Sequence, residues 1–462
     1  MTPASSLVCR PLATIVRDLR EGVVTSEQLA EEALQRIADP QGEGSRAFLT
    51  VYPEGARAMA RAVDAMRKDG MTISPLAGIP ISIKEAFEVA GSSMHFGSKV
   101  YAGGPKATRD AAVIRRIRAA GMVMVGRTNL PEFAFSTAGL NPHYGTPLNP
   151  YDRATGRTPG GSSSGAVVSV TDGMASVALA SDTGGSIRVP AALCGVTGFK
   201  PTARRVPLQG AGSLAKLLDS AGPIGHTVTC CAMLDAVLRD EDCAWDGADA
   251  PPVSRLRFGV LRNYVTDDMD DDVAAAYERA LADLHEAGAM LVDVTFPEVA
   301  KVAHANAKGG MQAAESYARH QHLLPHRAAE FDPRILSRVM RGQAMTAVDY
   351  LDTLRERAEV VEAFTRLARD FDALLLPTAP IVAPPLAAFE GDDAFFHATQ
   401  MKLLKSAGLI NFVDGCAVTL PIQAPGAAPV GLSLAAAGGC DEALLRTAFA
   451  VEALLRPEGQ AA

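Results

Sequence analysis

Apolar residues along this chain recur with two different periods. Between residues 25 and 38 they fall three and four positions apart, which predicts an amphipathic helix. Thr25 and Gln28 have the spacing of a capping box at the start of this helix. Between residues 79 and 83 the apolar positions are every second one, which predicts a strand with Lys84 directly after it.

Helical and strand-like segments follow one another over most of the chain. The pattern predicts further helices at 54–69, 109–120, 270–287 and 442–455, strands at 122–125, 256–260, 290–296, 374–376 and 430–434, and a buried helix and strand within 166–180. Residues 300–345 read as helical, residues 202–255 as looser with a turn at 219–223, and residues 385–408 have no readable periodicity. This alternation of helices and strands predicts an α/β fold.

Composition narrows the class of protein. The chain has 462 residues and a net charge of −8 with 21% charged residues, so it lacks the basic surface of a nucleic-acid-binding protein. It contains no run of 18 apolar residues and no apolar signal core near its start, so neither a membrane span nor export is expected. Seven cysteines without a Cys-x-x-Cys pair indicate free thiols in a reducing cytoplasm. We expect the four histidines of 300–345 to be solvated rather than to bind metal: His304, His320, His322 and His326.

The stretch Ser181–Pro190 has the composition of a site for acyl transfer. Gly184 and Gly185 can adopt backbone angles that other residues avoid, so several consecutive N–H groups can point into one concavity. Ser186 follows these donors, which places a hydroxyl beside groups that can stabilise a developing oxyanion. The alternative is a glycine-rich turn that only connects two elements.

Two other stretches indicate a catalytic site only when they are considered together with this one. Thr158–Gly165 is rich in glycine and serine and could be a flexible linker, although the segment after it is small and apolar. Lys84 ends an apolar strand, where a lysine is more often a solvated edge residue.

Together, the three stretches resemble the amidase signature family of serine hydrolases. The motifs are Gly-Ile-Pro-Ile-Ser-Ile-Lys, Gly-Gly-Ser-Ser-Ser-Gly and Asp-Thr-Gly-Gly-Ser-Ile-Arg-Val-Pro, and their key residues are 78 and 24 positions apart. The resemblance extends roughly from residue 10 to 456. It implies a mixed β-sheet core covered by α-helices on both faces, with an N-terminal helical layer at 1–70 and a catalytic domain at 71–462. The family pattern also implies no cofactor and no metal.

The resemblance assigns roles residue by residue. Ser186 would be the nucleophile, Lys84 the base, and Ser162 a bridging serine whose peptide bond is typically cis in the family. The N–H groups of Thr183, Gly184, Gly185 and Ser186 would form the oxyanion hole, Asp182 and Arg188 would support that loop, and Phe135 and Ser136 would line the pocket.

The chemistry is consistent with these roles. A lysine acts as a base only when neutral, and burial beside Ile81, Ile83 and Phe87 would lower its pKa from about 10.4. Ser-Lys arrangements are a known variant of the catalytic triad. The chain departs from the common family pattern at Glu85, Arg127 and the third serine of its serine loop, but not at the triad.

The sequence leaves several functions open. The first is an amidase that acts on a small carboxamide and releases ammonia or an amine, with urea-like and aryl amides as variants. A glutaminase-type subunit of a tRNA amidotransferase is the second. Gly161–Gly165 also fits the nucleophile elbow with Ser163 as nucleophile, but no apolar strand precedes it. No lysine follows Gly165, which argues against a P-loop. We expect 300–345 and 385–408 to cover the site, and the sequence leaves open whether the chain forms a homodimer.

Overall fold

The computed structural model describes residues 6–243, 245, 247 and 249–456. Across these residues, eleven strands form one mixed sheet in the order β1-β3-β2-β4-β6-β5-β10-β11-β9-β7-β8. The strands are β1 (Phe48–Val51), β2 (Pro80–Lys84), β3 (Val123–Thr128), β4 (Val177–Asp182), β5 (Thr197–Lys200), β6 (Ser220–Gly225), β7 (Arg257–Leu261), β8 (Met290–Val294), β9 (Ala373–Pro377), β10 (Cys416–Pro421) and β11 (Gly431–Ala436).

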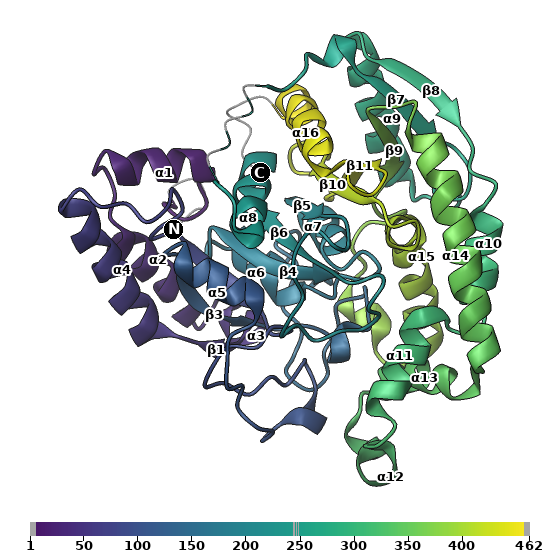
Figure 1. Ribbon diagram of the computed structural model, residues 1–462, viewed down its shortest axis with the longest axis horizontal. Helices are drawn as coiled ribbons and strands as arrows, with labels where there is room; N and C mark the ends of the chain where they lie inside the picture. The colour runs from purple at the N-terminus through teal and green to yellow at the C-terminus, as the bar shows by residue number, and fades with distance from the viewer. Residues whose placement is uncertain (1–5, 244, 246, 248, 457–462) are drawn as a thin grey trace.

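Helices cover both faces of the sheet, which confirms the predicted α/β fold. They are α1 (Leu12–Arg20), α2 (Ser26–Ala38), α3 (Gly44–Ala47), α4 (Pro53–Lys68), α5 (Ala112–Ala119), α6 (Ser164–Thr171), α7 (Arg188–Cys194), α8 (Val228–Arg239), α9 (Asp271–Glu286), α10 (Val299–Asn306), α11 (Gly310–His320), α12 (Leu324–Arg327), α13 (Pro333–Met340), α14 (Ala347–Ala368), α15 (Asp393–Phe412) and α16 (Asp441–Leu455). Helices α1, α2 and α4 lie at one end of the molecule, and α10 and α14 lie at the other (Figure 1). None of the helices in the described ranges is long and apolar enough to cross a membrane.

Burial of the central strands follows from this double cover. Every residue of β2, β3, β5, β6, β9, β10 and β11 is buried. A sheet covered on both faces favours apolar side chains on both, as in the continuous run of β9. Strand β2 alternates instead, and its buried Ser82 hydroxyl is satisfied by a hydrogen bond with Ser169 Oγ at 2.7 Å.

The parallel part of the sheet positions the candidate site. Strand β2 pairs in parallel with both β3 and β4. The carboxyl ends of parallel strands meet at one edge of a sheet, where α/β proteins often bind ligands. Lys84 ends β2 and Asp182 ends β4, so this edge brings the lysine motif and the glycine-serine motif together.

Several predicted elements are confirmed. Helix α2 starts with the predicted capping box, in which the Thr25 side chain accepts from Gln28 N and the Gln28 side chain accepts from Thr25 N. Helix α4 is followed by Gly70 at a φ of +77°. The N-terminal segment is not purely helical, however, because β1 joins the sheet by antiparallel pairing with β3.

The predicted turn at 219–223 is wrong. Residues Ser220–Gly225 are strand β6, which pairs on one side with β4 and on the other with β5. Gly222 supports close strand approach here rather than a bend, since a Cβ at this position would lie 2.5 Å from the Phe199 carbonyl oxygen. The supposedly loose 202–255 segment also contains helix α8.

The segment 385–408, which showed no readable periodicity, contains most of helix α15. Its buried residues Phe396, Gln400 and Leu403 share one face, and the buried Leu409 and Phe412 lie on the opposite side. A helix that is buried on opposite sides along its length shows little amphipathic period, so its sequence carries no clear helical signal.

Candidate active site

Lys84 lies at the carboxyl edge of the sheet and is fully buried. Its Nζ donates to Ser162 Oγ at 2.8 Å and to Ser181 Oγ at 3.0 Å, with a longer contact of 3.4 Å to the Ser181 carbonyl oxygen. The lysine therefore sits between the serine loop and the end of β4, and it is not a solvated edge residue.

Burial sets the protonation state of Lys84. It lowers the pKa from 10.5 to about 7, and the negative charges of Asp182 and Asp219 oppose this effect only in part. The amine is consequently neutral in a large share of molecules at neutral pH, which a lysine needs to accept a proton.

The glycine-serine stretch 158–165 is packed rather than flexible, which excludes the linker interpretation. All eight residues are buried, and Gly161 is so close to Gly139 that a Cβ would lie 2.8 Å from its Cα. The Gly161–Ser162 peptide bond is cis, as the family resemblance implies. Ser163 N donates to the Ser186 carbonyl oxygen at 3.2 Å, so the serine loop lies directly beside the loop that bears Ser186.

The loop from Thr183 to Ile187 joins β4 to α7 and is held by one buried carboxylate. Asp182 Oδ1 accepts from Gly185 N at 2.7 Å, and Asp182 Oδ2 accepts from Ile187 N at 3.0 Å. Gly185 has a φ of +114°, and a Cβ there would lie 2.5 Å from Ala407 Cβ. Glycine is therefore required at this position on both conformational and steric grounds.

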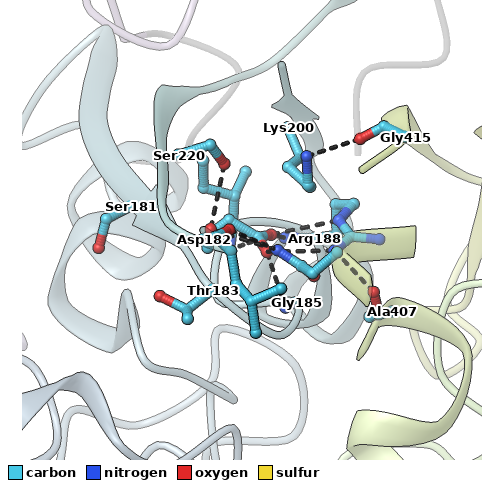
Figure 2. A network of polar contacts seen from close by, with 12 residues as sticks. Ser181, Asp182, Thr183, Gly185, Arg188, Lys200, Ser220, Ala407 and Gly415 are labelled. Carbon is cyan, nitrogen blue, oxygen red and sulfur yellow. Dashed lines mark hydrogen bonds and ion pairs between the residues drawn. The ribbon is translucent and has the colours of Figure 1, made fainter. Parts of the chain in front are cut away.

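Arg188 balances the charge of Asp182. Its Nη2 lies 3.1 Å from Asp182 Oδ1, and both side chains are fully buried. The same nitrogen donates to the Ala407 carbonyl oxygen at 2.8 Å and to Asn411 Oδ1 at 2.6 Å, which ties the loop to α15 (Figure 2). Burial alone would raise the pKa of Asp182, but the charge of Arg188 and its hydrogen bonds hold that pKa well below its usual range.

The four N–H groups assigned to an oxyanion hole differ in availability. Gly185 N is already donated to Asp182 Oδ1. The backbone N–H groups of Thr183, Gly184 and Ser186 have no hydrogen-bond partner among the described residues. Three donors of this loop thus remain for a ligand, and the fourth shapes the loop.

Asp219 is a second buried carboxylate behind this loop, and the sequence did not single it out. It accepts from Thr183 Oγ1 at 2.5 Å, from Ser213 Oγ at 2.6 Å and from Leu214 N at 3.1 Å. Burial raises its pKa to about 6, although these hydrogen bonds lower it. Asp219 links the nucleophile loop to the segment that carries Leu214.

A pocket with about 290 Å³ of empty space opens beside Ser186. Phe135 and Ser136, the predicted wall residues, both line it. Its other lining residues are Ala134, Thr137, Thr183, Gly184, Leu214, Gln312, Arg338, Gln400 and Leu404. The contributions of Gln312, Arg338 and Gln400 place α11, α13 and α15 at the pocket, in agreement with the expectation that 300–345 and 385–408 cover the site.

Two departures from the family pattern form one contact. Arg127 Nη2 lies 2.6 Å from Glu85 Oε1, and both side chains are buried. Arg127 Nη1 also donates to the Ser93 carbonyl oxygen at 2.7 Å. The two residues that depart from the common family pattern therefore pair with each other, beside the triad rather than within it.

The histidines of 300–345 do not behave alike. The His304 side chain is 76% exposed and pairs with Glu356, which agrees with a solvated residue. The same expectation is wrong for His320, which is 1% exposed, stacks on Phe133 at 4.0 Å and contacts the Tyr101 hydroxyl through Nδ1 at 2.9 Å. Within the described part of the chain, no group of three or more His, Cys, Asp or Glu side chains could hold a metal ion.

Comparison with known proteins matches the chain to a family. The family model described as Amidase matches residues 28–445. The chain belongs to the amidase signature family. It is therefore a hydrolase that acts on carbon–nitrogen bonds other than peptide bonds, and the family acts on small amides.

Relatives within the amidase signature family differ in their named activities. The chain is 35% identical to 2-amino-5-chloromuconic acid deaminase of Comamonas testosteroni, over 96% of each chain. It is 34% identical to a glutamyl-tRNA(Gln) amidotransferase subunit of Chloroflexus aggregans, over 94% of each. A crystal structure of an amidase superposes with a TM-score of 0.84 at 31% identity, covering 96% of this chain and 100% of the other.

Proposed function

We propose that this amidase signature enzyme hydrolyses the C–N bond of a small carboxamide through an acyl-enzyme on Ser186. The observation that carries the proposal is the buried Lys84, whose pKa is lowered to about 7 and whose Nζ lies 2.8 Å from Ser162 Oγ. The pocket beside Ser186 is smaller than most drug-sized ligand sites, because its empty space of about 290 Å³ includes the solvent at its mouth, which supports a small substrate.

The proposed reaction begins when Ser186 Oγ attacks the carbonyl carbon. Its proton passes to Ser162, and the Ser162 proton passes to the neutral amine of Lys84. The N–H groups of Thr183, Gly184 and Ser186 stabilise the tetrahedral oxyanion. When the C–N bond breaks, the proton returns through Ser162 to the leaving nitrogen.

Deacylation repeats these steps with water. Water attacks the ester carbonyl of the acyl-enzyme and gives a proton to Lys84 through Ser162. The C–O bond to Ser186 then breaks, and Ser186 Oγ regains the proton. The products are a carboxylic acid and either ammonia or an amine, and the enzyme returns to its starting state.

A glutaminase-type role in an amidotransferase is the second candidate. It is supported by relatives that are named as subunits of glutamyl-tRNA(Gln) amidotransferase, at 34% identity. A chain with that role would use glutamine and would depend on partner proteins. The name of the deaminase relative instead points to a reaction on a small acid.

Product release by the purified chain tests the proposal. We would measure ammonia from aliphatic, aryl and urea-like amides and from glutamine, with no partner protein and no ATP. Activity should fall by several orders of magnitude in Ser186→Ala. Ser163→Ala is the matched control, since Ser163 is equally buried and adjacent to the triad but takes no part in the relay. Normal turnover in Ser186→Ala, or loss only in Ser163→Ala, would overturn the assignment.

A further inference from the structure

Arg338 brings a positive charge to the pocket beside Ser186 without a counter-charge. It lies on α13 and lines the pocket, and none of the lining residues is an aspartate or a glutamate. Its buried Nε has no hydrogen-bond partner, and among the described residues no acidic side chain pairs with its guanidinium. Most arginines close to the protein interior are paired, because an unpaired cation that loses water is costly.

The surroundings of Arg338 keep it charged and fixed in place. Its guanidinium lies 4.4 Å above the centre of the Phe135 ring, which orients the side chain by a cation–π contact. Burial lowers its pKa to about 10, and the positive charge of Arg341 contributes to this lowering, so the group is still charged at neutral pH. The side chain is thus a partly buried cation, held against Phe135, that lines the pocket beside Ser186.

Gln400 adds an oriented donor to the same pocket. Its Oε1 accepts from Ser136 Oγ at 2.9 Å, from Thr137 N at 2.9 Å and from Ala138 N at 3.3 Å. These three donors fix which end of the amide faces the loop, so the NH₂ end is turned away from it. The Nε2 atom has no partner among the described residues, although Gln400 is 1% exposed and lines the pocket.

We propose that the pocket takes an amide that carries a carboxylate and no ammonium group, with Arg338 as the counter-charge and Gln400 Nε2 as a second donor. The forked guanidinium matches the two oxygens of a carboxylate, and such charge-assisted hydrogen bonds are among the stronger ones in proteins. The inference rests on the proposed function of the site, whose substrate class it names.

The absence of acidic side chains in the pocket lining disfavours the α-ammonium group of free glutamine. Its α-ammonium would lie in a pocket whose charged lining residue is Arg338, so it would lack an acceptor of opposite charge. Like charges in a partly desolvated site repel, which disfavours the zwitterion relative to the same chain without its amino group. The structure therefore favours a mono-amide of a dicarboxylic acid over glutamine.

Three five-carbon compounds separate these features. Glutaramate carries the amide and the carboxylate, glutaramide replaces the carboxylate by a second amide, and glutamine adds the α-ammonium to glutaramate. We expect kcat/KM for glutaramate, or for its shorter homologues malonamate and succinamate against their diamides, to exceed that of the neutral partner at least ~10-fold. Glutamine should be used more slowly than glutaramate. Equal or better use of the neutral diamides, or of glutamine, would overturn the proposal.

A pair of arginine variants tests the role of Arg338 itself. Arg338→Gln should reduce kcat/KM for the carboxylate amides about 10- to 100-fold and leave the diamides within about threefold. Arg341→Gln removes the same charge from a nearby exposed position and should leave both classes unchanged. An equal loss on both classes in Arg338→Gln would contradict carboxylate recognition and indicate a merely structural role.

Binding without turnover separates this proposal from the proposed function. In Ser186→Ala, titration calorimetry with glutaramate and glutaramide should show tighter binding of glutaramate, and added Arg338→Gln should abolish the difference. If wild-type enzyme cleaves no amide but this preference holds, the proposed function fails and the carboxylate site stands. If amides are cleaved without any preference for glutaramate, the carboxylate site fails and the function stands.

Discussion

Lowering the pH through 7 should protonate Lys84 and remove the base on which attack by Ser186 depends. Burial lowers the pKa of this lysine from 10.5 to about 7, so roughly half of the molecules carry a neutral amine at pH 7, about one in ten at pH 6 and about one in a hundred at pH 5. At its ordinary pKa only about 0.03% would be neutral at pH 7. The plot of log kcat/KM should therefore rise with a slope of one below pH 7 and level off above it.

The assay is ammonia release at low substrate concentration between pH 5 and 9. Because kcat/KM reports groups of the free enzyme, the substrate should have no group that titrates in this range, and succinamide meets that condition. Thermal melts at each pH confirm that the enzyme stays folded.

Two variants test whether Lys84 causes the rising part of the pH profile below pH 7, the acid limb. The negative charge of Asp219 raises the pKa of Lys84, so Asp219→Asn should move the limb to lower pH. Glu132 is a buried carboxyl in the short turn Glu132–Ala134, next to the pocket residues Ala134 and Phe135. Burial raises its pKa to about 8, and Glu132→Gln should leave the position of the limb unchanged. The reasoning is refuted if kcat/KM stays constant from pH 8 to pH 5, or if the limb moves with Glu132 rather than with Asp219.

Other consequences concern the groups around Lys84. Lys84→Met should lower turnover at least ~1,000-fold and raise the melting temperature. The gain should be larger at pH 6 than at pH 9, because the pKa of Lys84 is lower in the folded than in the unfolded state, so the wild type loses stability as the pH falls from 10.5 to about 7. An equal gain in melting temperature at pH 6 and pH 9 would contradict this. Asp182→Asn leaves the buried Arg188 without its counter-charge and should cost ~3–5 kcal/mol in urea unfolding, whereas an unchanged midpoint would exclude a supporting role for the pair. Ser181→Ala removes one of two hydroxyl partners of Lys84 and should lower kcat up to about tenfold, far less than Ser162→Ala; steady-state kinetics that rank them in reverse would assign the relay to Ser181.

The sequence was most informative where local chemistry dominates. The capping box at Thr25 and the helix-ending Gly70 depend on neighbours within a few positions, and both were readable from the sequence. The three motifs also identified the segments that carry Lys84, Ser162 and Ser186, whereas the parallel pairing of β2 with β4 that brings Lys84 and Asp182 to one edge of the sheet was visible only in the structure. Resemblance to a family, rather than periodicity, supplied the roles of these residues.

Features decided by distant contacts were not readable. Strand β6 looked like a turn, because the partners that make Gly222 acceptable in a strand are β4 and β5. Helix α15 is buried on more than one side and so had no amphipathic signal. The contact between Lys84 and Ser181 joins residues 97 positions apart, and only the register of β2 against β4 could have suggested it.

The pocket was the least predictable part of the site. Arg338 and Gln400 come from helices far along the chain and meet Phe135 and Ser136 only in the folded protein. An arginine in a helix is ordinarily a solvated residue, so its missing counter-charge becomes visible only once its neighbours are known.

Covalent labelling with a fluorophosphonate, which reacts with activated serines, tests the central claim most directly. Peptide mapping by mass spectrometry of wild type, Ser186→Ala and Lys84→Met after identical exposure would locate the adduct. We predict one adduct, on Ser186, that is absent from Ser186→Ala and forms far more slowly in Lys84→Met. An adduct on Ser162 or Ser163 in wild type, or labelling of Ser186 at an undiminished rate without Lys84, would contradict the account.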